Sequence, residues 1–271
     1  MKIAFIGGGN MASALISGLA GKFTAGSNIH VVDPNAGALD KLHAAHGVTT
    51  AGTVDAAVAA SDVVVLSVKP QQMRDVAASL KQHLRSDALV LSIAAGIRGA
   101  DLARWLGGHA AIVRTMPNTP ALIGRGITGM VAMQGVSDAQ KAAADAIMKA
   151  VGETVWLDDE AMIDPVTGVS GSGPAYVFYF LEAMQQAAVE LGLSAEQGRE
   201  LAVATFAGAA ELAKRSDEPL SVLRERVTSK GGTTYAALTS MEQSGVKEAV
   251  VNAVKAASAR GRELGEELGR D

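Results

Sequence analysis

The sequence predicts an α/β protein in which a doubly wound parallel sheet is followed by an all-helical domain. Up to about Trp156, short apolar runs alternate with helical patterns, which is typical of a parallel sheet covered on both faces. Some runs, such as Val63–Leu66, are continuously apolar, as expected for strands that are buried on both faces. After Asp164 the strand-like runs stop and helical periodicities take over. We therefore expect a first domain over residues 1–160 and a helical domain over residues 161–271.

The expected strands are short and rich in β-branched and other apolar residues. Because helical patterns separate them, neighbouring strands are expected to run parallel. They cover Ile3–Ile6, Ile29–Val32, Val63–Val68, Leu89–Ile93, Ile112–Arg114, Met130–Met133 and Thr154–Trp156.

Long helices are expected in the second domain. Apolar residues recur at three- and four-residue spacing across Pro174–Leu191. The next helix begins after Ser194, which forms a capping-box pattern with Gln197, and a final helix covers about Val246–Leu268. The amount of apolar surface in so small a domain favours burial against another subunit, whereas an ordinary core helix is the alternative for the small residues of Ala202–Ala213.

The composition limits the classes of function. The chain of 271 residues is 48% apolar and 19% charged and contains no cysteine, so it is globular and has no disulfide, thiolate metal ligand or cysteine nucleophile. No apolar stretch approaches the roughly 20 residues of a transmembrane helix, and the start of the chain lacks a secretion signal, so a cytoplasmic location is expected. A net charge of −4 gives no electrostatic reason for binding to nucleic acid or membrane, and the five scattered histidines suggest no metal site.

A glycine-rich turn follows the first expected strand. Gly7–Ala12 reads GGGNMA, which matches the pattern GxGxxA between a strand and a helix. Gly7 permits the tight turn, Gly9 lets the backbone approach a pyrophosphate, and Ala12 lets the helix pack close to the strand. Phosphates would meet free amides at the positive end of the helix dipole. The pattern predicts a Rossmann-like dinucleotide site, and a glycine turn without a ligand is the alternative.

An acidic residue ends the second expected strand. Asp33 lies about 20 residues beyond the glycine turn, where a carboxylate can bind the adenosine ribose hydroxyls. This position favours NADH, because a 2′-phosphate would bring negative charge toward Asp33 and no Lys or Arg lies between Asp33 and Lys41 to offset it. The alternative is that Asp33 starts the turn at Pro34 and points away, which leaves the choice of cofactor open.

Five later blocks narrow the choice among dinucleotide enzymes. They are Val68–Gln71 (VKPQ), Ala94–Gly96 (AAG), Arg114–Ala121 (RTMPNTPA), Asp164–Tyr176 (DPVTGVSGSGPAY) and Val227–Thr234 (VTSKGGTT). Together they resemble the pyrroline-5-carboxylate reductase family, in that family's order and over nearly the whole chain. Lys230 departs from the pattern, since proline is more usual there, and the departure bears on the rigidity and charge of its loop.

The resemblance implies an enzyme that reduces the C=N bond of Δ1-pyrroline-5-carboxylate to L-proline, the last step of proline biosynthesis, with hydride from NADPH or NADH. It also implies a homodimer interwoven through the helical domains, often assembled further into a decamer. Asn118, which follows a later strand, fits the nicotinamide end of the cofactor. The residues that the resemblance implies for the cofactor site are Ile6, Gly7, Gly8, Gly9, Asn10, Met11, Ser67, Val68, Lys69, Pro70, Ala94 and Ala95.

The resemblance also implies that the loop before Thr234 holds the substrate, which carries a carboxylate. Gly231 and Gly232 permit unusual backbone angles, and a helix is expected near Thr233, so successive amides can form an anion nest. By resemblance, Thr234 lies nearest the imine nitrogen and donates or relays the proton. A helix cap without a ligand is the alternative. The expected substrate residues are Ser229, Gly231, Gly232, Thr233 and Thr234.

Two other functions compete with this interpretation. A β-hydroxyacid dehydrogenase also joins a glycine-rich α/β domain to a helical one, but its catalytic lysine has no counterpart in the lysine-free helix over Pro174–Leu191. A dinucleotide sensor without turnover would need no substrate loop. Binding of proline or a planar analogue at Ser229–Thr234 would distinguish the reductase from the sensor.

Overall fold

The computed structural model describes residues 1–270, which form two compact units. The first unit holds residues 1–172 together with the end of the chain from Lys255 onward, and the second is Gly173–Val254. The sequence pattern predicts a boundary after residue 160 instead. Residues 161–172 stay with the sheet because helix α7 (Ile163–Val166) packs against strands β6 and β7. The end of the chain belongs there because Gly265 approaches Gly96 so closely that a Cβ on Gly265 would lie 3.0 Å from the Gly96 carbonyl oxygen.

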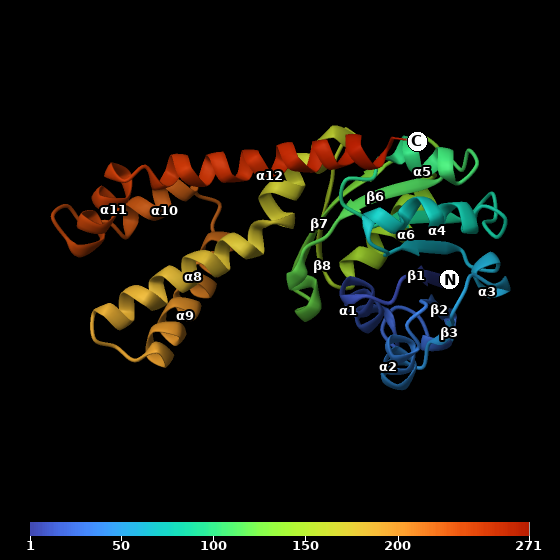
Figure 1. Ribbon diagram of the computed structural model, residues 1–271. Helices are drawn as coiled ribbons and strands as arrows, with labels where there is room; N and C mark the ends of the chain where they lie inside the picture. The colour runs from blue at the N-terminus through green and yellow to red at the C-terminus, as the bar shows by residue number, and fades with distance from the viewer. Residues whose placement is uncertain (271) are drawn as a thin grey trace. The chain divides into compact units, whose positions relative to one another are not determined.

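The first unit is built on an eight-stranded sheet with the order β3-β2-β1-β4-β5-β6-β7-β8 (Figure 1). From β1 the chain moves outward to β2 and β3, and then crosses to the other side of β1 at β4, which is the doubly wound arrangement predicted from the sequence. The strands are β1 (Ile3–Ile6), β2 (Ile29–Val32), β3 (Thr49–Ala51), β4 (Val63–Leu66), β5 (Leu89–Ser92), β6 (Ile112–Met116), β7 (Gly126–Ala132) and β8 (Gly152–Trp156).

Two details of the sheet differ from the expectation. Strand β7 runs antiparallel to β6, whereas all other neighbouring strands are parallel. The connection over residues 117–125 is too short for the crossover that a parallel partner needs, which takes a dozen residues or more. Strand β3 was not expected because Thr49 and Thr50 are exposed at the edge of the sheet, so the segment lacks an apolar pattern.

Helices cover both faces of this sheet and give it two apolar cores. Along β1, Ile3 and Phe5 belong to one core, and Ala4 and Ile6 belong to the other, as the two-residue period of a strand requires. Helices α1 and α6 contribute to the first core, and α4 and α5 contribute to the second. The helices of this unit before α7 are α1 (Asn10–Leu19), α2 (Ala36–His46), α3 (Ala56–Ala59), α4 (Met73–Leu80), α5 (Gly99–Trp105) and α6 (Asp138–Lys149).

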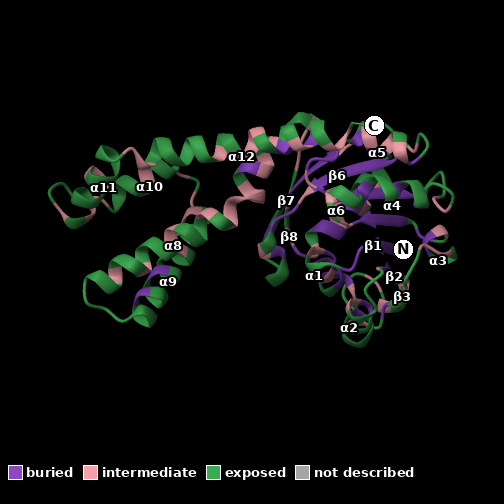
Figure 2. Cartoon of the chain, in the orientation of Figure 1, coloured by how far each residue is buried: buried purple, intermediate pink, exposed green. Residues whose placement is uncertain are grey.

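The second unit is all-helical, and most of its residues are exposed (Figure 2). Its helices are α8 (Gly173–Glu190), α9 (Ala195–Lys214), α10 (Leu220–Arg226), α11 (Thr233–Gln243) and the first part of α12 (Val246–Leu268). The Ser194–Gln197 capping box is confirmed at the start of α9. Only Gly198 and Ala202 are buried in α9, and α8 has no buried residue. Within residues 1–270, no helix is long and apolar enough to span a membrane.

Strand β8 is tied to helix α6 by one carboxylate. Oδ1 of Asp145 accepts hydrogen bonds from the Thr154 hydroxyl at 2.7 Å and from Nε1 of Trp156 at 3.0 Å, while its Oδ2 lies 2.7 Å from Nζ of Lys149. Burial raises the pKa of Asp145, but these three donors more than offset that effect, so the pKa lies below its usual value. A carboxyl group whose pKa is lowered by folding stabilises the fold at pH values above its usual pKa. This stabilisation is lost as the pH falls through the pKa of the folded state.

Replacing Asp145→Asn should therefore lower the Tm at pH 7, by about 2 °C to 4 °C, because the charge-assisted bonds are lost. This difference in Tm between the wild type and Asp145→Asn should disappear at low pH, where the wild-type carboxyl is protonated. Differential scanning calorimetry from pH 7 to pH 3 checks this expectation. A deficit in Tm of the same size at both ends of that range would contradict it.

Candidate functional site

The glycine turn after β1 lies at the carboxyl edge of the sheet. Ile6 is in register with Val32 of β2 on one side and with Leu66 of β4 on the other. The segments that follow β1, β2 and β4 therefore meet at one edge, where the strand order reverses. Open α/β sheets bind ligands in the crevice outside the carboxyl ends of their strands, at such a reversal.

Gly7 has no room for a side chain. Its φ is +104°, and a Cβ would lie 2.8 Å from both the carbonyl carbon and the carbonyl oxygen of Ser67. The Ser67 hydroxyl donates to the carbonyl of Ile6 at 3.0 Å and to that of Gly7 at 2.8 Å. The turn after β1 and the segment after β4 are thus packed backbone to backbone, and only glycine suits both the conformation and the contact.

The start of α1 is open. Gly9 is its N-cap, with φ −71° and ψ −175°, and no side chain accepts a hydrogen bond from the first-turn amides. A Cβ added to Gly9 would meet nothing within 4 Å. Gly9 and Asn10 are exposed, Met11 is half-buried against the core, and Ala12 is buried beneath them. Free amides beside open space suit a phosphate, because the helix dipole and the amides both favour negative charge.

Asp33 lies against this turn. Oδ2 of Asp33 accepts a hydrogen bond from the Gly8 backbone N–H at 2.7 Å, and Oδ1 accepts one from the Asn35 backbone N–H at 2.8 Å. The side chain therefore starts the turn at Pro34, as one alternative supposed, but it does not point away, because it also contacts the glycine turn. A Cβ on Gly8 would lie 3.5 Å from Oδ2 of Asp33.

The other expected cofactor residues also follow β4, β5 and β6. Val68 is half-buried, Lys69 is exposed, and Pro70 opens a short turn that leads into α4. After β5, Ala94 is buried and Ala95 is half-buried. Ser92 is in register with Leu66, so this segment lies at the same edge of the sheet as the glycine turn.

The Asn118 side chain is buried and makes one hydrogen bond to the protein from each end of its amide. Nδ2 of Asn118 donates to the carbonyl of Ser170 at 3.2 Å, and its Oδ1 accepts from the Ile127 backbone N–H at 3.0 Å. The amide therefore joins the end of β6 to the start of β7 and to the turn over 167–171. Its side chain holds the backbone of this edge in place.

The expected substrate loop belongs to the second unit. Gly231 has φ +73°, and the Gly232 amide donates to the carbonyl of Ser229 at 2.9 Å. Helix α11 begins at Thr233, as expected, with Gly232 as its N-cap and no side chain that caps it. Thr234 is half-buried, whereas Lys230 and Thr233 are exposed. The loop thus presents helix-start amides and threonine hydroxyls together.

A charged cluster beside β6 was not expected as a site. Oε1 of Glu160 accepts hydrogen bonds from Nη1 of Arg114 and from the Gly99 backbone N–H, both at 2.6 Å. Arg114 is only 4% exposed. Arg114 and Glu160 line a cavity of about 290 Å³ together with Arg98, Asp159, Asp164 and Arg262. Burial raises the pKa of Asp164, although Arg114, Arg98 and Arg262 oppose the rise.

The sequence contains only part of the signal for this cluster. Arg114 and Asp164 lie inside two of the blocks that carry the family resemblance, but nothing in the local pattern joins them to Glu160. Their proximity follows from the packing of α7 on β6.

Comparison with known proteins agrees with this architecture. Residues 2–96 match the family model described as NADP oxidoreductase, coenzyme F420-dependent, and residues 160–264 match the one described as pyrroline-5-carboxylate reductase dimerisation. The pyrroline-5-carboxylate reductase of Pseudomonas aeruginosa is 46% identical over 99% of this chain and 98% of its own length. That of Haemophilus influenzae is 41% identical over 97% of both chains.

Solved structures give the same result. The pyrroline-5-carboxylate reductase of Coxiella burnetii has a TM-score of 0.90 and 39% identity, and the match covers 97% of this chain and 98% of that one. The pyrroline carboxylate reductase of Plasmodium falciparum, solved with NADP bound, has a TM-score of 0.87 and 31% identity over 98% of both chains. These matches extend over nearly the whole chain and include both compact units. The chain belongs to the pyrroline-5-carboxylate reductase family.

Proposed function

We propose that this chain reduces the C=N bond of Δ1-pyrroline-5-carboxylate to give L-proline, with NADPH or NADH as the source of hydride. One observation carries the proposal. The glycine turn at the reversal of strand order leaves the α1 amides uncapped beside open space, in a chain whose reductase relatives match it from end to end.

The cofactor site is proposed to run along the carboxyl edge of the first unit. The α1 amides beside Gly9 bind the pyrophosphate, and the backbone after β4 and β5 lines the rest of the cofactor. Reduced nicotinamide supplies the hydride when the cofactor is bound. The protein itself must hold the reduced nicotinamide and the imine in the correct distance and orientation, because the reaction needs no covalent nucleophile.

The substrate loop is proposed to hold the carboxylate and the ring nitrogen. The first-turn amides of α11, at Thr233 and Thr234, form the carboxylate nest, supported by the dipole of α11, and Gly231 gives the loop before them its left-handed turn. The Thr234 hydroxyl lies nearest the nitrogen in this proposal. Since a threonine hydroxyl is a weak acid, it relays a proton from water rather than acting alone.

The competing functions are less well supported. Helix α8 contains no lysine, which a β-hydroxyacid dehydrogenase would need at this place. The 3-hydroxyisobutyrate dehydrogenase of Mycobacterium tuberculosis is similar at 19% identity and a TM-score of 0.51, which is a likeness of fold. A sensor without turnover would have no use for the nest before α11.

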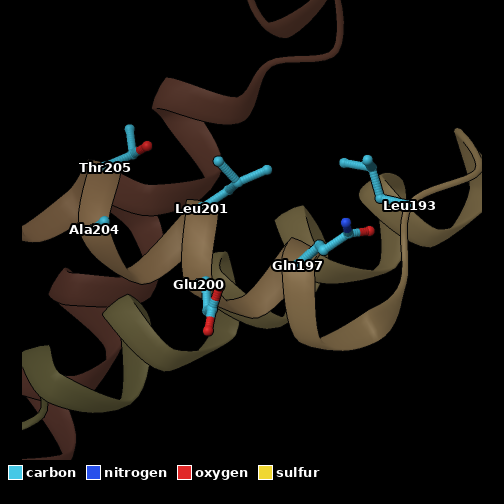
Figure 3. Close-up of a pocket in the computed structure, with 6 residues that line it drawn as sticks. All are labelled: Leu193, Gln197, Glu200, Leu201, Ala204 and Thr205. Atoms are coloured by element: carbon cyan, nitrogen blue, oxygen red, sulfur yellow. The ribbon is translucent and has the colours of Figure 1, made fainter.

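The second unit is proposed to fold as part of a homodimer, and decamers built from such dimers belong to the same proposal. Leucine, phenylalanine and tyrosine side chains remain exposed on its helices, among them Phe178 at 66%, Tyr179 at 73% and Leu201 at 57%. Leu193 and Leu201 line a pocket together with Glu200, and Figure 3 shows the two leucine side chains on one side of α9 and that of Glu200 on the other. So many exposed apolar side chains favour burial against another protein surface. In this proposal a second copy of the chain provides that surface. A cytoplasmic location, expected from the sequence, completes the proposal.

Enlarging Gly9 tests the cofactor site. Because nothing lies within 4 Å of a Cβ at this position and its φ is negative, Gly9→Ala and Gly9→Leu should fold with unchanged Tm. The side chain then fills the space of the pyrophosphate, so we expect dinucleotide binding to weaken by about 10-fold for alanine and beyond 100-fold for leucine.

The wild type should consume reduced dinucleotide when Δ1-pyrroline-5-carboxylate is added, as followed by nicotinamide absorbance. Isothermal titration with both variants supplies the binding data. A wild type that binds dinucleotide but never reduces the imine would overturn the proposed reaction, and a Gly9→Leu protein with normal affinity would overturn the proposed cofactor site.

Removing the Thr234 hydroxyl tests the substrate loop. Thr234→Ala should lower kcat about 100-fold or more, while Thr234→Ser keeps a hydroxyl and most of the activity. The matched control is Thr239→Ala on the same helix, because the Thr239 hydroxyl only donates to the Tyr235 carbonyl at 2.8 Å. The affinity for dinucleotide should be the same in all four proteins. Equal kcat for Thr234→Ala and the wild type would remove Thr234 from the mechanism.

A charge on the exposed face of α9 tests the assembly. Leu201→Glu should shift the wild-type dimer toward monomer, because a buried glutamate without a partner is costly at an apolar interface. Phe23→Glu serves as the control, since Phe23 is an exposed apolar residue of the first unit, 41% accessible. Light scattering after size exclusion gives the masses. A monomeric wild type, or a dimer unaffected by Leu201→Glu, would count against the interface.

A further inference from the structure

The segment between β5 and α5, residues 93–98, is held at its first end by β6. It contains Ala94 and Ala95, which are proposed to line the cofactor. The Thr115 hydroxyl of β6 donates to the Ser92 carbonyl at 3.0 Å, and Thr115 is buried. The Ser92 hydroxyl in turn accepts from the Ala94 backbone N–H at 3.4 Å. The place where this segment leaves the sheet is therefore fixed by buried contacts with β6.

The other end of the segment is held by one oxygen of Glu160. Oε1 of Glu160 accepts hydrogen bonds from the backbone N–H of Gly99, the first residue of α5, and from Nη1 of Arg114 in β6, both at 2.6 Å. The N-cap residue of α5, Arg98, makes no capping hydrogen bond with its side chain. A carboxylate 61 residues away therefore takes that place, through a charge-assisted bond that is roughly twice as strong as a neutral one.

The buried guanidinium of Arg114 keeps Glu160 beside the sheet. Arg114 is in register with Ser92 of β5, and its guanidinium remains charged although the residue is only 4% exposed. An arginine buried in this way is costly without a carboxylate partner, so Glu160 cannot leave β6 without exposing the fold to that cost. Both ends of the segment are thus placed by β6, directly through Thr115 and indirectly through Arg114 and Glu160.

We propose that Glu160 is a positioning residue for the cofactor, because it ties the start of α5 to β6 and thereby places the backbone of Ala94 and Ala95 against the dinucleotide. This proposal rests on the dinucleotide site of the proposed function. Glu160 acts only through residues 93–98 and touches neither the dinucleotide nor the imine. Loss of the tie lets the segment shift, which weakens dinucleotide binding and misaligns the nicotinamide for hydride transfer.

Two variants separate the positioning role from a purely stabilising one. Glu160→Ala removes the acceptor of Gly99 and leaves Arg114 unpaired, so the Tm should fall and the Kd for reduced dinucleotide should rise about 10-fold. In Glu160→Ala with Arg114→Met the unpaired buried charge is gone, so the Tm should recover. The Gly99 amide still lacks its acceptor there, so the Kd should stay about 10-fold raised. Titration with NADPH and with NADH, followed by nicotinamide fluorescence, gives the Kd values without turnover.

Steady-state kinetics add a second measurement. In both variants kcat should fall and the KM for dinucleotide should rise, while the KM for Δ1-pyrroline-5-carboxylate stays within about 2-fold of the wild type. The control is Asp159→Asn, an exposed neighbouring acid that lines the same cavity and whose loss changes the net charge equally. Asparagine keeps an oxygen for the Ala161 amide, which donates to Oδ1 of Asp159 at 2.9 Å, so this variant should match the wild type throughout.

The outcomes separate this role from the proposed function. A Kd that recovers together with the Tm in the double variant overturns the positioning role, because Glu160 would then act through stability alone. An unchanged Kd in Glu160→Ala, or an equal rise in Asp159→Asn, overturns it as well, and the reductase function stands in each case. If Glu160→Ala alone fails to fold, the double variant decides, since it buries no unpaired charge. A folded wild type that binds neither dinucleotide overturns the proposed cofactor site itself.

Discussion

The close contact between the glycine turn and the end of β4 is the constraint on which the candidate site depends. Gly7 packs its backbone against the backbone of Ser67, and the Ser67 hydroxyl holds the carbonyls of Ile6 and Gly7. A side chain at residue 7 would push the two strand ends apart, and α1 would then start elsewhere. Because the turn is held there, the open amides of α1, the Asp33 carboxylate and the segments after β4 and β5 converge at one edge of the sheet.

The two compact units are stabilised in different ways. In the first, strands such as β1 and β4 are wholly buried and alternate their side chains between two cores, so this unit has the interior of an independent domain. In the second, α8 has no buried residue although it carries Phe178 and Tyr179. A helical unit with so little interior of its own is consistent with the proposed homodimer. In an assembly of that kind, folding and association are linked, and the apparent stability rises with protein concentration.

The sequence predicted the local features of this molecule and missed the ones that depend on distant contacts. The GGGNMA turn, the Ser194 cap and the bounds of α12 are determined by residues within a few positions of one another, and all three agree with the structure. Strand β3 escaped detection because an edge strand can be polar. The reversed direction of β7 follows from the length of one connection rather than from the apolar pattern. Asp33 starts the turn at Pro34, as one alternative supposed, but its contact with Gly8, 25 residues away, keeps it from pointing away from the glycine turn, and no local pattern could predict that contact.

The charged cluster shows the same limit and has a physical consequence. Glu160 joins Arg114, which lies 46 residues away in the sequence, to the amide that begins α5, just after the segment containing Ala94 and Ala95. Gly265 of α12 packs against Gly96 of the same segment. Three elements from different parts of the chain therefore fix the backbone that is proposed to line the cofactor.

Burial raises the pKa of Asp164, so the native state favours the protonated acid more than the unfolded state does. The stabilisation from that preference is present below the usual pKa of aspartate and is lost as the pH rises through the folded value. The cluster fixes the relative positions of β6 and α5. The buried Arg114 side chain of β6 is held by the Glu160 carboxylate, which also accepts from the first amide of α5, so few other arrangements are possible.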